Sequence, residues 1–168
     1  KSGLVILSCE LIDNNGKELC KCVNQYIDQW GLEEGFRAYI NEKCTFCSTL
    51  VDRIVPGRIR DAAEVARLDQ ENGYTDPLAD VGEIFGVWNI EGPEWLGEQL
   101  PFKKAGVNCI VVPDVTPYKK RKVRILNGAH TTLVLACHQA GNDIMRFALM
   151  DEDILAMAKK AVYEEILP

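Results

Sequence analysis

The sequence lacks any apolar run long enough to cross a bilayer, since stretches such as residues 3–7 are far shorter than the ~20 residues that a membrane helix needs. It also lacks a basic excess: 19 Lys and Arg stand against 25 Asp and Glu, a formal net charge of −6. Nucleic-acid binding depends on clustered cations, so that class is disfavoured. The first residues show no secretory-signal pattern. We therefore expect a cytoplasmic globular protein without membrane or nucleic-acid partners.

A dinucleotide-binding fingerprint is also missing. No Gly-x-Gly-x-x-Gly pattern occurs in the chain, so the residues alone predict no nucleotide cofactor. The only basic run covers residues 119–124. It has two readings, the solvated first turn of a helix or a site for an anionic substrate.

Seven cysteines form an odd set, which favours a reducing compartment over a complete set of disulfides. Cys20, Cys22, Cys44 and Cys47 superficially offer four thiolates for zinc. However, Cys20 and Cys22 fall in a stretch with helical periodicity, where two residues correspond to about 200° around the axis. The pair would face opposite sides of that helix, so we expect no metal site.

The first third of the chain has the pattern of an α/β domain. We expect a buried strand over residues 4–9, a helix from the turn at 14–16 to Gly31, a short helix over 33–41 and an apolar strand-like stretch over 46–55. A strand, two helices and a further strand are typical of the end of an α/β sheet domain.

The pattern changes after Gly57, and helical signals then dominate. A capping-box-like start at Asp61 predicts one helix, Pro117 begins a long helix to about residue 140, and Asp151 begins another. A strand-like stretch over residues 107–112 interrupts them. We therefore predict an α/β part over residues 1–57 and a mainly helical part over 58–168, each of them incomplete.

Three polar residues on the long helix form the strongest candidate site. Lys122, Asn127 and His130 would lie within an arc of roughly 140° and along about 12 Å of an α-helix axis. Apolar neighbours predict that this helix is otherwise substantially buried, and polar groups on a buried helix need partners. The alternative is that Asn127 and His130 satisfy each other or nearby backbone, while Lys122 reaches water. Gly128, in mid-helix, suggests a close approach to the backbone.

Residues 122–131 resemble the Lys-(four residues)-Asn-(two residues)-His signature of the long-chain mannitol dehydrogenase family. Residues 8–16 and 46–56 agree with the family in the same order, and the likeness covers essentially the whole chain. The resemblance implies the end of a Rossmann-type nucleotide-binding domain joined to the start of a helical C-terminal dehydrogenase domain. It also implies NAD as cofactor and a chain that is an internal portion of a longer enzyme.

The same resemblance implies roles for individual residues. Lys122 matches the catalytic acid/base, because a ketone that accepts hydride develops alkoxide charge that must be protonated, and a partly desolvated lysine can supply that proton. Asn127 matches a donor that polarises the carbonyl. His130 matches a residue that binds substrate hydroxyls. Asp52 matches an acid near the active site, although pairing with the adjacent Arg53 is an equally good reading.

One departure bears on the substrate. Mannitol dehydrogenases carry a second asparagine donor where this chain has Leu11, which argues against plain polyols. A sugar acid needs a cation for its carboxylate, and Arg60 and Arg121 are candidates unless they are only surface charges.

The expected reaction is therefore the reversible reduction of tagaturonate to altronate. Fructuronate or polyol oxidoreduction is the alternative within the family. A non-catalytic helical binding module is the alternative outside it, and a zinc-binding scaffold is a weaker one.

Overall fold

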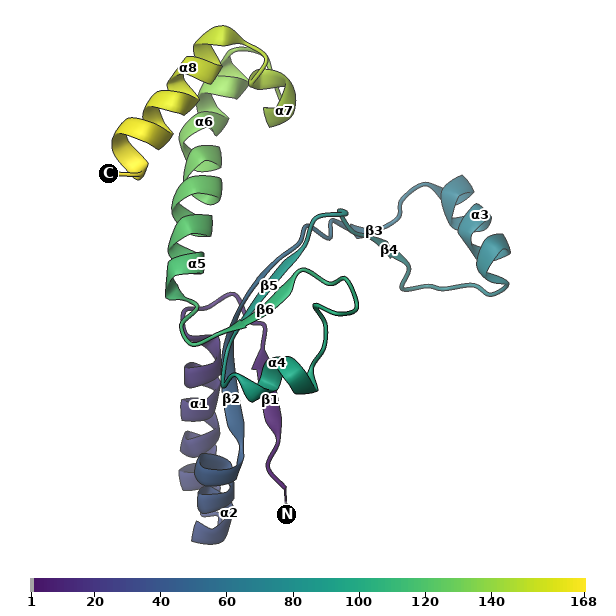
Figure 1. Cartoon of the computed structure of the whole chain (residues 1–168). Coiled ribbons are helices and arrows are strands. Elements are labelled where there is room, and N and C mark those ends of the chain that lie inside the picture. The colour runs from purple at the N-terminus through teal and green to yellow at the C-terminus, as the bar shows by residue number, and fades with distance from the viewer. Residues whose placement is uncertain (1) are drawn as a thin grey trace. The chain divides into compact units, whose positions relative to one another are not determined.

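The computed structural model describes residues 2–168, which form two compact units that divide between Pro113 and Asp114 (Figure 1). The first unit is a mixed sheet with helices, and the second is helical. No helix within residues 2–168 combines the length and the apolar character that a membrane span requires.

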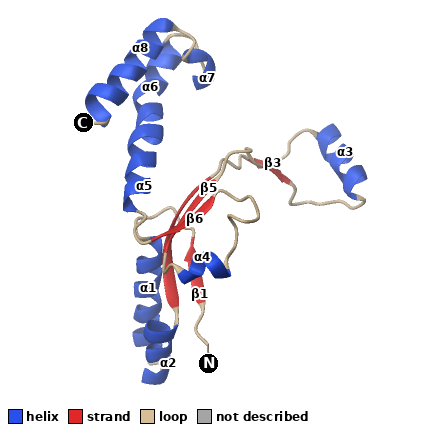
Figure 2. Ribbon diagram, viewed as in Figure 1, coloured by secondary structure: helices blue, strands red, loops and turns tan. Residues whose placement is uncertain are grey.

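The first unit is organised around a four-stranded sheet, shown in red in Figure 2. Its strands, in the order in which they pair, are β1 (Val5–Ser8), β2 (Thr45–Asp52), β5 (Val87–Glu91) and β6 (Cys109–Val112). β1 is parallel to β2 and β5 is parallel to β6, whereas β2 and β5 are antiparallel. The sheet is thus mixed, with its one antiparallel pairing in the middle.

The core of the first unit consists of small and branched side chains from the sheet and one helix. Cys47, Ile90, Leu96 and Cys109 are all buried in it. Leu96 belongs to the short helix α4 (Trp95–Gln99). Burial raises the pKa of the Cys47 and Cys109 thiols, which keeps both in the unreactive protonated form.

Helix α1 (Asn15–Trp30) follows β1 and ends at Gly31, whose φ of 60° suits glycine. The helix was predicted from its apolar spacing, and both its existence and its stop are confirmed. At its start, Gly16 lies against the backbone of β2. A Cβ on Gly16 would come within 2.4 Å of the carbonyl carbon of Cys47, so only glycine fits there.

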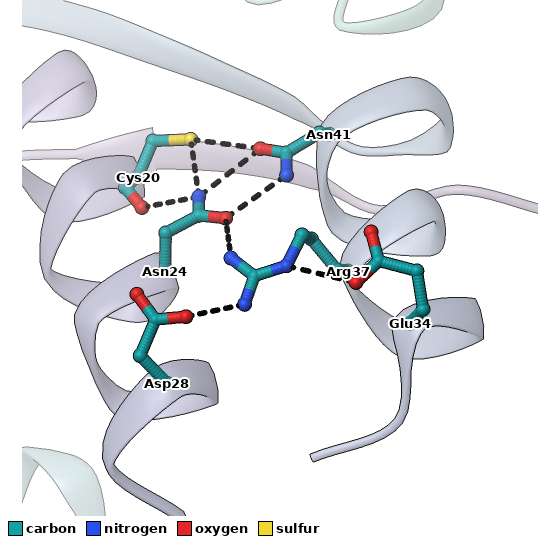
Figure 3. A network of polar contacts seen from close by, with 6 residues as sticks. All are labelled: Cys20, Asn24, Asp28, Glu34, Arg37 and Asn41. Atoms are coloured by element: carbon teal, nitrogen blue, oxygen red, sulfur yellow. Dashed lines mark hydrogen bonds and ion pairs between the residues drawn. The ribbon is translucent and has the colours of Figure 1, made fainter. Parts of the chain in front are cut away.

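A polar network joins α1 to the next helical segment, which comprises α2 (Glu34–Ala38) and the π-helical turn η1 (Tyr39–Lys43). Asn24 and Asn41 exchange side-chain hydrogen bonds of 3.0 and 2.9 Å, and Arg37 donates to both Asp28 and Asn24 (Figure 3). The hydrogen bond to Asp28 raises the pKa of Arg37. These contacts explain why this short second helix, which buries little apolar surface, keeps its place on α1.

The connection between β2 and β5 contains β3 (Gly57–Arg58), α3 (Ala62–Asn72) and β4 (Asp80–Val81), with β3 and β4 paired antiparallel. Asp61 caps α3 by accepting a hydrogen bond from the Ala63 N–H, as the sequence predicted. At the base of the connection, Arg53 Nε donates to the Glu83 carbonyl at 2.8 Å. The connection therefore leaves and rejoins the sheet at a defined point.

The second unit consists of one long helix and a shorter helical segment that packs on it. The long helix runs through α5 (Thr116–Arg121), η2 (Lys122–Asn127) and α6 (Gly128–Gln139), and α7 (Met145–Ala148), α8 (Glu152–Lys160) and η3 (Ala161–Ile166) follow. Leu133, Cys137, Ala148 and Ile154 form the core. The predicted long helix and the Asp151 cap of α8 are both confirmed.

The compact units divide at a different place from the predicted boundary between residues 57 and 58. The region after Gly57 was expected to be mainly helical, yet β5 pairs with β2 and β6 pairs with β5. Strand β5 was not predicted at all. Because these two strands complete the sheet, residues 58–113 belong to the same compact unit as β1 and β2.

Candidate active site

The three residues with the strongest sequence signal lie on one continuous helix of the second unit. Lys122 begins the turn η2, Asn127 ends it, and His130 lies in the first turn of α6. The Lys122 side chain is partly buried, while Asn127 and His130 are exposed. The helix thus carries an ammonium, a carboxamide and an imidazole within nine consecutive residues.

The hydrogen bond of His130 determines which of its ring nitrogens is available. Nδ1 lies 2.8 Å from the carbonyl oxygen of Leu126, one helical turn earlier. A carbonyl oxygen only accepts, so Nδ1 must carry the hydrogen. In the neutral ring Nε2 is then the acceptor, which suits it to receive a hydrogen bond from a hydroxyl group. The sequence left open that His130 forms a hydrogen bond with nearby backbone, and Nδ1 does so.

The expectation that this helix is substantially buried is wrong for the described residues. Val134 and Leu135 are 53% and 72% exposed, and Leu126 is also exposed. The buried side chains are Leu133 and Cys137, which face α7 and α8. The prediction assumed that all the apolar residues of this helix lie on one buried face. They are instead distributed around the helix, and only the face toward α7 and α8 is packed within this unit.

Gly128 was expected to mark a close approach to the backbone. Ile166 of η3 does come near: a Cβ on Gly128 would lie 3.5 Å from Ile166 Cδ1. That distance is an ordinary van der Waals contact. Space therefore does not exclude alanine at this position.

Asp52 lies in the first unit, at the end of β2, where it pairs in register with Val87. Its neighbour Arg53 directs Nε to the Glu83 carbonyl, and the Ile54 N–H donates to the Glu83 carboxylate at 2.6 Å. The hydrogen bond from Arg53 Nε therefore goes to the base of the β2–β5 connection. Asp52 belongs to the first unit, and the helix that carries Lys122 belongs to the second.

The two candidate carboxylate ligands lie in different units. Arg60 is exposed, just before α3. Arg121 is exposed at the end of α5, with its guanidinium 5.7 Å from the centre of the Tyr118 ring. Such a cation–π contact leaves the guanidinium N–H groups free to bind an anion. Of the two, only Arg121 adjoins Lys122 on the same helix.

Asn15 is a structurally important residue that the sequence reading treated only as part of a helix-capping turn. Its buried side chain donates to the carbonyls of Glu10 and Thr49, and its oxygen accepts from the N–H groups of Thr49 and Gly16. It therefore holds the loop that follows β1 against β2. Leu11, in the same loop, is 95% exposed.

One hollow in the described part of the chain lies away from Lys122, Asn127 and His130. A hollow of about 470 Å³ lies beside β6 and α4, and none of the predicted site residues lines it. Within residues 2–168, no group of three or more His, Cys, Asp or Glu side chains is placed to hold a metal ion. The helix with Lys122, Asn127 and His130 remains the candidate.

Comparisons with known proteins agree with this organisation. Residues 1–104 match the mannitol dehydrogenase Rossmann domain, and residues 114–168 match the mannitol dehydrogenase C-terminal domain. The gap between the two matches contains the division between the compact units.

Among curated proteins, the altronate oxidoreductases of Escherichia coli O6:K15:H31 (strain 536 / UPEC) and Shigella flexneri are each 48% identical over 166 residues. The alignments cover 99% of this chain and 34% of those proteins. The chain thus spans about a third of the length of the curated relatives that it matches.

Solved structures give the same assignment. A D-sorbitol dehydrogenase in substrate-free form is similar with a TM-score of 0.74 and 27% identity, over 98% of this chain and 32% of that one. A Pseudomonas fluorescens mannitol 2-dehydrogenase, in a ternary complex with NAD and D-mannitol, has a TM-score of 0.61 and 24% identity, over 98% of this chain and 32% of that one, and supports the fold alone. The mixed sheet, the helical second unit and both domain matches show that the chain belongs to the mannitol dehydrogenase family.

Proposed function

We propose that this chain contributes the proton-transfer part of the active site of an NAD-dependent sugar-acid oxidoreductase, which reduces tagaturonate reversibly to altronate. The observation that carries the proposal is the grouping of Lys122, Asn127 and His130 on one helix of the C-terminal domain. The 48% identity to altronate oxidoreductases supports this choice of substrate. The seven unpaired cysteines agree with a cytoplasmic location.

We propose NAD as the cofactor because the chain belongs to the mannitol dehydrogenase family. The candidate residues of this chain would act on the substrate and not on the cofactor. NADH would supply the hydride. The chain contains no Gly-rich turn of the kind that holds a pyrophosphate, so its own candidate residues act on the substrate. We therefore expect no NADH-dependent activity from these 168 residues alone.

Lys122, Asn127 and His130 have different proposed roles at the substrate. As the ketone becomes an alkoxide, the Lys122 ammonium stabilises the charge on the oxygen and gives it a proton. The Asn127 carboxamide donates a hydrogen bond to the same oxygen and favours the charged transition state. His130 accepts a hydrogen bond from a neighbouring hydroxyl at Nε2, because its Nδ1 is committed to Leu126. Arg121 and Arg60 are the proposed ligands of the carboxylate, and Asp52 is a proposed substrate-binding acid.

The proposal is tested by NADH oxidation with tagaturonate, fructuronate and fructose offered separately, using the protein at the length of its relatives. We expect kcat/KM to be highest for tagaturonate. A preference for fructuronate or fructose would refute the proposed substrate and leave a different oxidoreductase of the family. Inactivity with all three ketones would refute the proposed reaction and favour a binding module.

Asn127→Ala should remove about 3 kcal/mol of transition-state stabilisation, the usual effect of losing one oxyanion donor, and kcat/KM should fall accordingly. The loss should appear mainly in kcat, because the alkoxide exists only near the transition state. Steady-state kinetics with the ketone measure both constants. If KM rises while kcat stays unchanged, Asn127 binds the substrate equally well in both states and is not an oxyanion donor.

A further inference from the structure

The turn that separates Lys122 from Asn127 is not α-helical. Residues Lys122–Asn127 form a π-helical turn between α5 and α6. The N–H of Gly128 donates to the carbonyl of Val123, five residues earlier, and also to that of Ile125, three residues earlier. In an α-helix each N–H bonds to the carbonyl four residues earlier. A turn closed by bonds between residues five apart therefore contains one residue more than a turn of the α-helix on either side of it.

This extra residue changes which side chains are neighbours. On an α-helix, residues four apart lie on the same face, whereas residues five apart diverge by about 140°. When the hydrogen bonds connect residues five apart, the fifth residue takes the position that the fourth has in an α-helix. Lys122 and Asn127 then lie one above the other.

We propose that the π turn η2 is a positioning element, whose register brings the Lys122 ammonium and the Asn127 carboxamide to the same substrate oxygen. This inference rests on the proposed function, because it assigns the pair a common target. The sequence reading, with 100° for every residue, spread the site over a wide arc. The register of η2 brings that pair onto one face.

Side-chain hydrogen bonds occupy two carbonyls at the end of the turn. His130 Nδ1 donates to the Leu126 carbonyl, and Thr132 Oγ1 donates to the Gly128 carbonyl, each at 2.8 Å. Where η2 meets α6, the backbone hydrogen bonds change from residues five apart to residues four apart. Side-chain donors to the carbonyls at this place therefore support the junction between η2 and α6. His130 therefore has a structural contact at the border of the turn, in addition to its proposed contact with the substrate.

The register is tested first by a metal clamp, without any assay of activity. Two histidines that lie on one helical face bind a divalent metal, as in zinc sites with histidines four residues apart. We expect Lys122→His/Asn127→His to bind Ni²⁺ at least about tenfold more tightly than Val123→His/Asn127→His in calorimetric titrations. Asn127→His alone is the reference, since His130 lies three residues beyond it, and the unmodified chain gives the cysteine background. Equal affinities or the reverse order would show an α-helical turn and overturn the inference.

The functional consequence is tested by changing the length of the turn in the protein at the length of its relatives. Deleting Arg124, whose side chain is exposed, removes the extra residue and leaves Lys122 and Asn127 four residues apart in a regular α-helix. We expect kcat to stay within about tenfold, whereas one alanine inserted after Arg124 should lower kcat at least about 100-fold. Arg124→Ala controls for the lost side chain, and circular dichroism checks folding.

The two tests separate failure of the inference from failure of the proposed function. If the deletion is as damaging as the insertion while both variants remain folded, the register does not position the pair, and the inference fails. If the unmodified protein reduces none of the ketones, the proposed function fails, and the metal clamp still decides the register.

Discussion

Lys122→Ala is expected to lower kcat by roughly two to four orders of magnitude, the usual range for loss of a general acid or base. The reason is chemical: without the ammonium, the alkoxide formed by hydride transfer has no adjacent proton donor. Steady-state kinetics with the ketone measure the loss, and KM for NADH should change little.

Two matched substitutions make this prediction specific. Lys120→Ala removes the same charge from an exposed position two residues earlier and should leave kcat near its original value. Lys122→Arg keeps the charge but should not restore turnover, because an arginine does not release its proton at neutral pH. If Lys122→Ala turns over normally, or if arginine substitutes fully, Lys122 contributes only charge or nothing, and its assignment as the acid/base is wrong.

Gly16→Ala should destabilise the first unit by about 3 kcal/mol or more, at the upper end of overpacking effects. The new Cβ would lie 2.4 Å from the Cys47 carbonyl carbon, 2.5 Å from the Ser48 nitrogen and 2.6 Å from the Cys47 oxygen. All three are backbone atoms of β2, which pairs with β1 at Cys47 and Ser48 and with β5 from Thr49 onward, so a shift of this backbone would disturb the sheet. For a chain of this size the change corresponds to a decrease in Tm of roughly 6–12 °C, measurable by calorimetry.

Gly35→Ala is the matched control. Gly35 lies within α2, and a Cβ there would meet no atom within 4 Å. Alanine has the higher helix propensity, so Tm should stay the same or rise slightly. Equal decreases in Tm for the two variants would mean that the sensitivity to alanine does not come from the contact with β2.

Patterns confined to one segment predicted much of this fold. The apolar run of β1, the spacing of Leu19, Val23 and Ile27 in α1 and the Asp151 cap of α8 each depend on neighbouring residues, and each is found. Strand β5 was missed because it is short, contains the buried Asn89 and takes its identity from pairing with β2. Without β5, the pairing that joins residues 58–113 to the sheet could not be predicted.

The candidate site shows the same limit. The resemblance of residues 122–131 to a family signature pointed to Lys122, Asn127 and His130, whereas their spacing alone left a purely structural role open. Their mutual geometry was not predictable, because the π turn is a property of backbone hydrogen bonds that no side-chain pattern marks. The role of Asn15 was also hidden, since its partners on β2 are far away in the sequence.

The long connection between β2 and β5 has a consequence for how enzymes with this sheet can diverge. Its base is closed by Arg53 and Glu83, and β2 and β5 are already direct neighbours in the sheet. The strands therefore do not depend on the connection's length, and each doubling of a flexible loop costs only about 0.6 kcal/mol. Insertions and deletions between residues 58 and 82 can accumulate over evolutionary time without disturbing the sheet. A lineage can thus remodel this segment while the helix that carries Lys122 stays unchanged.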